Sequence, residues 1–305
     1  MGRRRLIAGF VLAASGATLF ASKAILVKLA YVERPDPLLM LVWRMIFALP
    51  FFIGAGALTL VRAKSAGRLP SGRSLLRAAA IGLVGYYIAM YLDFAGLVHV
   101  TARLERLALF TYPIFLLFIG ALFFETRLTS GHLVAAAASY GGLALVFLSD
   151  LAMTAGGNVP LGTLLVLGSA VAFALYQLLA KALIAEMGSI MFTSVALTAA
   201  SVASLAHGVA VLGPSGLAAP SDFLWLAAAA GILATVIPSY FVNEGMARIG
   251  PESTALISFL SPLLTIAMGV AVLREHFSLM DGLGTSLVCM GVGYHTWREL
   301  REPKP

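Results

Sequence analysis

The stretch Tyr91-Leu-Asp-Phe-Ala-Gly96 recurs in pattern as Tyr240-Phe-Val-Asn-Glu-Gly245, and the two copies lie 149 residues apart. With the same offset, Pro113 falls on Pro262. Self-similarity at a fixed, long period indicates that the chain is built from two related halves. Internal repeats of apolar segments are typical of secondary transporters, in which the substrate site lies where the halves meet.

The repeat extends beyond these stretches in both directions. One extra residue later, Glu125 falls on Glu275. The openings Ser15-Gly-Ala-Thr-Leu-Phe20 and Ser169-Ala-Val-Ala-Phe173 also match, again with a one-residue gap. The similarity therefore covers most of each half.

The composition indicates a membrane protein. The 305 residues are 60% hydrophobic and 11% charged, with a mean hydropathy of +0.94, whereas an average soluble domain is about 25% charged. Barrel strands do not fit, because the apolar runs are continuous and too long. Since a helix needs roughly 20 apolar residues to cross a bilayer, we expect an all-α membrane protein with ten transmembrane helices. Their expected ranges are 6–27, 38–61, 76–96, 103–123, 129–148, 161–182, 189–212, 223–243, 252–273 and 279–297.

The lysines and arginines predict the orientation of this bundle, because cytoplasmic loops retain them. They gather before the first span, between the second and third spans, and after the last span. The connections at 149–160 and 213–222 contain none. Ten spans with both termini in the cytoplasm place the basic groups on the cytoplasmic side. The pI near 9.8 is then a mark of topology and gives little support to nucleic-acid binding.

We divide this single membrane domain into a first five-helix repeat, 1–150, and a second, 151–305. An odd number of spans means that the second repeat enters the membrane from the opposite side, so the repeats are inverted around a central cavity. Each inverted repeat can adopt the conformation of the other, and this exchange is the basis of alternating access. Because one chain holds both halves, no partner subunit is needed to complete the cavity, and we expect a functional monomer.

The sequence lacks the residue patterns of metal-binding proteins, nucleotide hydrolases and channels. Cys289 is the single cysteine, so neither an intramolecular disulfide nor a cysteine metal cluster is possible. The five histidines show no metal-binding spacing, and no P-loop is present. We expect no cofactor, no metal and no catalytic residue, and neither a pore loop nor a ring of like charges indicates a channel. The basic and apolar N-terminus is expected to be an uncleaved first span.

Several motifs resemble those of a known family. They are Gly250-Pro-Glu-Ser-Thr-Ala-Leu-Ile-Ser-Phe-Leu-Ser-Pro262 with Leu273-Arg-Glu275, Thr111-Tyr-Pro113 with Phe124-Glu125, and Phe173-Ala-Leu-Tyr-Gln-Leu-Leu-Ala-Lys181. These segments resemble the EamA repeats of the drug/metabolite transporter superfamily, and the chain is most similar there to the bacterial aromatic amino acid exporters. The resemblance implies a cavity lined by the first four helices of each half, with the fifth and tenth helices packed outside. It also implies a place in the bacterial cytoplasmic (inner) membrane.

From these features we expect a secondary transporter, not an enzyme. It would export small amphipathic metabolites, above all aromatic and other neutral amino acids, by alternating access. Its partners would be the small-molecule substrate and the lipid bilayer, with no nucleic acid. Export of other metabolites or drugs, and a lipid-carrier flippase, are the alternatives that the sequence leaves open.

Charged side chains within spans are candidates for the site, because a charge in hydrocarbon is costly unless it faces a cavity or a partner. Lys23 either snorkels to the outer interface or contacts a substrate carboxylate. Arg44 is expected in a structural ion pair. Arg103 and Arg106 either recognise a carboxylate or lie at an external gate or interface with Glu105 as their partner, and we favour the gate or interface.

Aromatic and hydroxyl side chains are the other candidates. Two faces of the third span carry such groups: Tyr87, Tyr91 and Phe94 on one, and Tyr86, Met90 and Asp93 on the adjacent one. With side chains of the fourth, sixth and eighth spans they would form an aromatic, mildly polar cavity that suits a flat amphipathic solute. The substrate-binding candidates are Lys23, Tyr86, Tyr87, Tyr91, Phe110, Tyr112, Tyr176, Gln177, Ser239 and Tyr240.

Five residues are candidates for gating or hinge motion. Pro113, Pro238 and Pro262 are expected to kink or break their helices near mid-membrane, because a proline frees the carbonyl four residues before it. Asp93 and Glu244 lie near span ends in nearly equivalent repeat positions and are either gate residues or solvated helix ends. The sequence places no carboxylate at mid-membrane, so facilitated diffusion or weakly coupled exchange fits as well as strict proton antiport.

The topology can be tested by cysteine labelling. Cysteine introduced at Asn158 should be labelled from outside intact cells, whereas cysteine at Ser65 should not, because ten spans with cytoplasmic termini place Asn158 outside and Ser65 inside. The reverse labelling pattern would contradict this topology.

Overall fold

The computed structural model describes residues 3–67, 69–123, 130–153, 157–258 and 260–301, and all regular structure in these residues is helical. The elements labelled η are π-helices. In chain order the elements are α1 (Arg3–Ala21), α2 (Lys23–Glu33), α3 (Pro37–Ser65), α4 (Gly72–Gly82), η1 (Leu83–Ile88), α5 (Ala89–Leu97), α6 (Ala102–Phe110), α7 (Tyr112–Phe123), α8 (Ser130–Met153), α9 (Val159–Met187), α10 (Ser189–Gly216), α11 (Ser221–Gly231), η2 (Ile232–Val236), α12 (Ile237–Ser258), α13 (Leu260–Val272) and α14 (Leu279–Arg301).

Local sequence signals set where several helices begin. Asp36 accepts a hydrogen bond from the amide of Leu39 at 3.0 Å and directly precedes Pro37, the first residue of α3. Thr101 accepts one from the amide of Leu104 at 3.2 Å at the start of α6. Such caps satisfy amides that have no partner inside the helix, and proline suits the first helical position because its missing N–H is not needed there.

Eight segments of the described chain are long and apolar enough to cross a membrane, and they match the first eight predicted spans. The other two predicted spans look different. In place of a span over 252–273, α12 continues to Ser258 and α13 has 13 residues, about 20 Å of helix. The last span, α14, has 23 residues and carries Asp281 in its first turn. The all-α membrane fold is confirmed, whereas the division into ten membrane-crossing helices stays a prediction.

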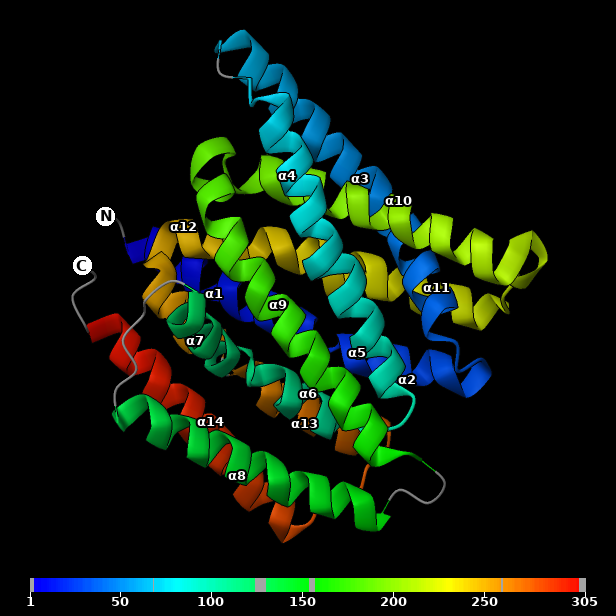
Figure 1. Cartoon of the computed structure of the whole chain (residues 1–305), viewed down its shortest axis with the longest axis vertical. Helices are drawn as coiled ribbons and strands as arrows, with labels where there is room; N and C mark the ends of the chain where they lie inside the picture. Colours follow the sequence, from blue (N-terminus) through cyan, green and yellow to red (C-terminus); the bar gives the residue numbers. More distant parts are fainter. Residues whose placement is uncertain (1–2, 68, 124–129, 154–156, 259, 302–305) are drawn as a thin grey trace.

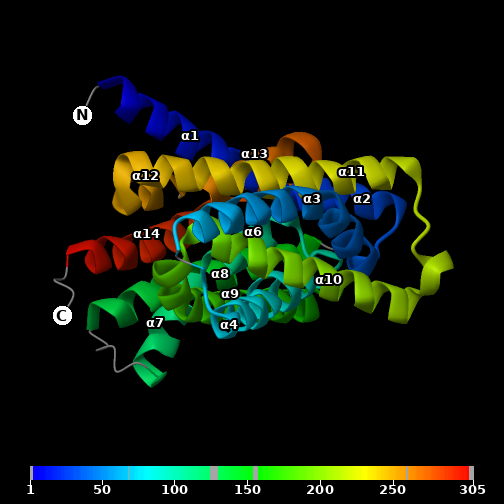
Figure 2. The same cartoon turned by 90° about the horizontal axis from the view of Figure 1, so that it is seen from above.

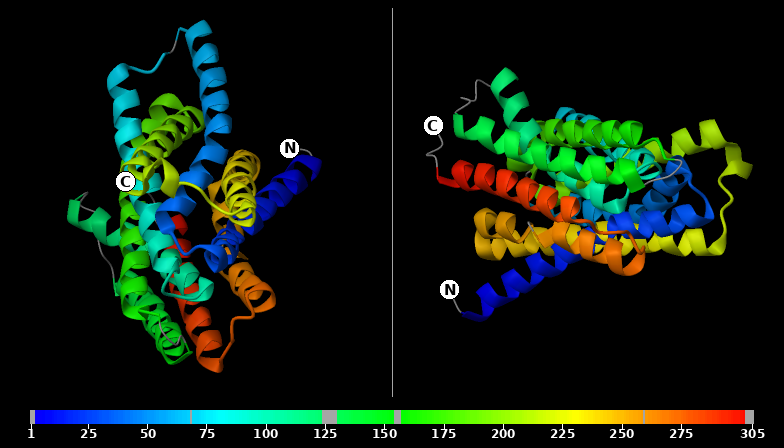
Figure 3. Two further views of the ribbon diagram at one scale, coloured as in Figure 1. Left: turned by 90° about the vertical axis from the view of Figure 1, so that its right-hand side faces the viewer. Right: turned by 90° about the horizontal axis from the view of Figure 1, so that it is seen from below.

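The long helices pack in pairs (Figures 1 and 2). α1 lies along α12, α9 lies along η1 and α5, and α3 lies along α10. α8 and α14 pack on each other at one edge of the molecule. The start of α1 and the end of α14 lie at the same end of the bundle (Figure 3). In the repeat alignment α1 corresponds to α9, and α12 corresponds to α5. The pairing of α1 with α12 and the pairing of α9 with α5 are therefore equivalent contacts between the two halves.

Glycines of the repeated motif bring these paired helices together. A Cβ on Gly96 would lie 2.5 Å from Val166 Cγ2 of α9, and a Cβ on Gly245 would lie 2.9 Å from Ala13 of α1. Small residues let membrane helices approach closely and gain packing contacts that lipid cannot replace. The glycines that mark the repeat in the sequence therefore lie where each half contacts the other.

Each half contains a short π-helix at the same repeat position. η1 begins at Leu83 and η2 begins at Ile232, again 149 residues apart. A π-helix adds one residue to the turn and shifts the faces that follow, and such bulges are frequent at functional sites. Nothing in the periodicity of the sequence predicted these two segments.

Irregular helix geometry accompanies two of the prolines that were expected to bend their helices. α6 ends at Phe110 and α7 begins at Tyr112, so the fourth span is interrupted just before Pro113. Pro238 is the second residue of α12, directly after η2. Pro262 is the third residue of α13, and residue 259 before that helix lies outside the described residues.

The contact between α8 and α14 can be tested at a pair of adjacent glycines. A Cβ on Gly142 would lie 2.5 Å from the carbonyl oxygen of Gly284. We expect Gly142→Leu to lower the melting temperature of the purified protein, because overpacking a close contact costs about 1–3 kcal/mol. Gly141→Leu is the matched control, since a Cβ there meets nothing within 4 Å. Equal melting temperatures for the two variants would show that this contact is not close.

Candidate functional site

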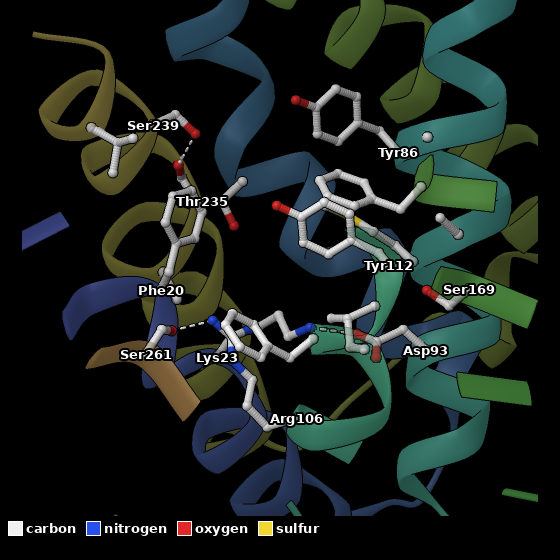
Figure 4. Close-up of a pocket in the computed structure, with 18 of the residues that line it drawn as sticks. Phe20, Lys23, Tyr86, Asp93, Arg106, Tyr112, Ser169, Thr235, Ser239 and Ser261 are labelled. Carbon is white, nitrogen blue, oxygen red and sulfur yellow. Dashed lines mark hydrogen bonds and ion pairs between the residues drawn. The ribbon is translucent and has the colours of Figure 1, made fainter. Parts of the chain in front are cut away.

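A cavity of about 360 Å³ lies between helices of both halves (Figure 4), within the range of about 300–1,000 Å³ typical of small-molecule sites. α1, α2, α3, η1, α5, α6 and α7 line it from the first half, and α9, η2, α12 and α13 line it from the second. Among the described residues, the paired edge helices α8 and α14 contribute nothing to this lining. The cavity is therefore a joint product of the two halves.

Aromatic rings form much of its wall. The aromatic lining residues are Phe20, Tyr86, Phe110, Tyr112 and Phe173. Tyr112 meets Phe173 edge to face, with ring centroids 5.1 Å apart. Behind this wall, Tyr176 stacks on Phe173 at 5.7 Å and its hydroxyl donates to the Tyr86 hydroxyl at 3.0 Å. These contacts hold the rings in place, so the wall is formed before any solute binds.

The third span presents one of its two predicted faces to the cavity. Three side chains of that face line it: Tyr86, Met90 and Asp93. Two side chains of the other face, Tyr87 and Tyr91, lie against His207 of α10. The His207 Nδ1 lies 2.7 Å from the Tyr87 hydroxyl, and its ring centroid lies 5.7 Å from that of Tyr91. His207 could not be predicted from the sequence, because a lone histidine without a metal-ligand spacing carries no signal.

Lys23, the first residue of α2, holds two buried carboxylates. Its Nζ donates to Asp93 Oδ2 at 2.5 Å and to Glu105 Oε1 at 3.1 Å. Lys23 therefore does not snorkel to the interface, and Asp93, which is 2% exposed, is not a solvated helix end. Nor is Glu105 the ion-pair partner of the α6 arginines, as was expected. Among the described residues, Asp93 Oδ1 and Glu105 Oε2 have no hydrogen-bond partner.

Arg44 of α3 is held by uncharged groups. Its Nε and Nη2 donate to the Thr235 hydroxyl at 2.9 and 2.7 Å, and its Nη1 lies 2.9 Å from Met90 Sδ. The guanidinium carbon lies 5.2 Å from the centroid of the Phe94 ring, a cation–π contact. No ion pair in the described part of the chain includes Arg44. The structural ion pair expected for Arg44 is therefore wrong.

Arg106 also lines the cavity without a carboxylate partner in the described residues. Its Nη2 donates to the hydroxyl of Ser261 on α13, across the boundary between the halves (Figure 4). Its Nε is buried and has no acceptor among the described residues. Lys23, Arg44 and Arg106 thus give the cavity three cationic side chains.

Arg103 belongs to a separate cluster where α6 begins. Its Nη2 lies 3.0 Å from Asp150 Oδ1 and its Nη1 lies 3.2 Å from Asp281 Oδ2. Asp150 also accepts hydrogen bonds from the Thr101 amide and hydroxyl, at 3.0 and 2.8 Å. The cluster ties α6 to the end of α8 and the start of α14. The expected pairing of Arg103 with Glu105 is therefore wrong. Asp150 and Asp281 were not predicted as partners, because Asp150 lies in a connection and Asp281 lies at the end of a span.

Glu275, the motif acid of the second half, caps α6 of the first half. Its Oε1 accepts a hydrogen bond from the amide of Ala102 at 2.7 Å. Burial raises the pKa of the Glu275 carboxyl, and the Ala102 amide and the charges of Arg103 and Lys28 act in the opposite direction. Its repeat partner, Glu125, lies outside the described residues.

The structure brings together half of the predicted substrate-binding residues. Those that line the cavity are Lys23, Tyr86, Phe110, Tyr112 and Ser239. Those that lie outside its lining are Tyr87, Tyr91, Tyr176, Gln177 and Tyr240. Of the gating candidates Asp93 lines it, whereas Glu244 pairs with Arg248 of the same helix at 2.8 Å on an exposed surface. Substrate contact and gating at all these residues stay predictions.

Comparison with known proteins identifies the family. Two stretches of the chain, residues 7–148 and 160–296, match the EamA-like transporter family. The chain belongs to this family. It is therefore a multi-pass membrane transporter of small molecules and not an enzyme.

Two similar proteins extend this comparison. The transporter is 29% identical over 308 positions to the "Uncharacterized transporter YcbK" of Bacillus subtilis (strain 168), an alignment that covers 99% of this chain and 96% of that protein. A solved crystal structure superposes on the transporter with a TM-score of 0.59 at 19% sequence identity. The superposition covers 96% of this chain and 99% of the chain in that crystal structure. At that identity the likeness shows the fold alone.

The lysine-centred triad can be tested by stability measurements. Lys23→Met should destabilise the transporter by about 3–5 kcal/mol, because it leaves two buried carboxylates without their cation. Glu105→Gln should cost less, since the pair between Lys23 and Asp93 remains. Adding Glu105→Gln to Lys23→Met should recover part of the loss. Unfolding in detergent, followed by circular dichroism, measures all three; a double variant less stable than Lys23→Met would contradict the triad.

Proposed function

We propose that this transporter exports small amphipathic metabolites, above all aromatic and other neutral amino acids, across the bacterial cytoplasmic (inner) membrane by alternating access. The observation that carries the proposal is the cavity between the two halves, with five aromatic side chains and several hydroxyl groups in its wall. A flat apolar group can pack on such rings, and stacking is worth about 0.5–1.5 kcal/mol per ring. The hydroxyl groups and the cations suit the polar end of the solute.

The proposed architecture is ten spans in two inverted repeats, with both termini in the cytoplasm. Three observations support it: the two separate family matches, the equivalent pairings of α1 with α12 and of α9 with α5, and the two π-helices 149 residues apart. The lysine and arginine distribution supports the orientation. Since both halves contribute to the cavity within one chain, the proposed functional unit is a monomer.

The proposed conformational change uses the irregular segments around the cavity. η1 and η2 have the wider π-helical turn in place of the α-helical one, and the fourth span is interrupted before Pro113; helix kinks concentrate at such places. Pro238 and Pro262 are the corresponding hinge candidates in the second half. In this scheme Asp93 changes partners on one side of the cavity, and Glu244 serves the opposite gate.

A lipid-carrier flippase is a second candidate, because three cations line the cavity and could face a lipid phosphate. A flippase substrate needs an opening toward the bilayer, whereas a free amino acid does not. Transport of amino acids or drugs into proteoliposomes, compared with movement of a labelled lipid between their leaflets, separates the two functions.

Removing one ring from the wall tests the proposed export function. Tyr86→Ala and Tyr112→Ala should each weaken apparent affinity for aromatic amino acids about fivefold, equivalent to about 1 kcal/mol, from lost stacking and hydrogen bonding. The measurement is uptake of labelled amino acids into proteoliposomes. Tyr294→Ala on α14 is the matched control, because that ring is 43% exposed and lies outside the cavity lining. Equal losses in all three variants would place the substrate elsewhere.

A further inference from the structure

The charges around the cavity do not balance. Lys23, Arg44 and Arg106 are the cations of its lining, and Asp93 is its one acid among the described residues. Counting Glu105, which binds Lys23 from behind, three cations face two carboxylates. With all five groups ionised, one positive charge has no counter-charge. A monoanionic group entering the cavity would neutralise it.

Arg44 is the cation to which that excess is best assigned. Both carboxylates are bound to Lys23, at 2.5 and 3.1 Å. Each of the two arginines feels the charge of one of these carboxylates, Arg106 that of Glu105 and Arg44 that of Asp93. They differ in burial, because Arg106 is only half-buried whereas Arg44 is fully buried. Arg44 has only a hydroxyl, a thioether and an aromatic ring as direct contacts, although it is 1% exposed. Removing a guanidinium from water without a counter-ion is costly, so a partner brought by a ligand would be bound strongly.

The corresponding position of the second half carries no cation. Arg44 is the eighth residue of α3, and Ala196 is the eighth residue of α10, the corresponding helix of the second half. A Cβ on Gly231 would lie 2.6 Å from the Arg44 carbonyl oxygen, and a Cβ on Gly82 would lie 2.4 Å from that of Ala196. The same close contact between a glycine and a helix backbone thus forms with alanine in one half and arginine in the other.

We propose that Arg44 binds the carboxylate of the transported solute, so that the substrates are aromatic or other apolar compounds with one free carboxylate. This inference rests on the proposed function, because it takes the cavity as the substrate site. A planar guanidinium presents paired N–H donors that match a carboxylate, and the aromatic wall then receives the apolar part. Lys23, which the sequence suggested for this role, is already neutralised by two acids.

Binding to the purified transporter tests the assignment with four probes: phenylalanine, 3-phenylpropionate, phenylalanine methyl ester and phenethylamine. The first two keep the carboxylate and the last two lack it. The wild type should bind the two carboxylates more tightly, by about tenfold or more. Arg44→Gln should lose this preference while its affinity for the ester and the amine stays unchanged. Arg62→Gln, at the exposed end of the same helix, is the control and should match the wild type.

A second measurement needs no ligand. Arg44→Met should melt at the same temperature as the wild type or higher, because it removes an unneutralised buried charge. A clear fall in melting temperature would show that Arg44 has a structural role and would overturn the inference. So would equal binding of the ester and the carboxylates, binding of none of the carboxylates, or loss of the preference in Arg106→Gln but not in Arg44→Gln. Failure of wild-type proteoliposomes to transport any amino acid would instead refute the proposed export function.

Discussion

A charge buried among membrane helices is costly without a partner, and ion pairs inside the protein connect much of this bundle. Lys23 joins the first span to the third and fourth by binding Asp93 and Glu105. Arg103 joins the fourth span to α8 and α14 through Asp150 and Asp281. Each cluster connects helices that are distant in sequence, and so replaces a costly isolated charge with a contact between spans.

Apolar packing supplies the rest of the architecture. The hydrophobic effect does not drive apolar helices together within lipid, so close backbone contact becomes the main gain. Gly96 and Gly245 provide it at the equivalent pairings of α5 with α9 and α12 with α1. These contacts hold the two halves around the cavity. Two π-helices, η1 and η2, contribute residues to the cavity wall, so the backbone there is less regular than in the flanking helices.

The symmetric frame and the asymmetric site serve different needs. In the proposed alternating access the two halves exchange equivalent conformations, and the glycine contacts at Ala196 and Arg44 are alike in the two halves. A substrate has no such symmetry. The apolar group and the carboxylate of the proposed substrate need different surroundings. Aromatic side chains of the cavity wall would receive the first, and Arg44, at a position where the second half has alanine, the second.

The sequence by itself determined the membrane class, the two-fold repeat, most span boundaries, the family and the prolines at which helices become irregular, because these depend on composition and on local backbone chemistry. It also separated the two faces of the third span. Only the tertiary structure decided that the face with Tyr86 and Asp93 lines the cavity while Tyr87 turns to His207. Likewise, the partners of Lys23 lie 70 and 82 residues away. Helix rotation and long-range pairing are set by packing against neighbours, and no spacing within one helix encodes them.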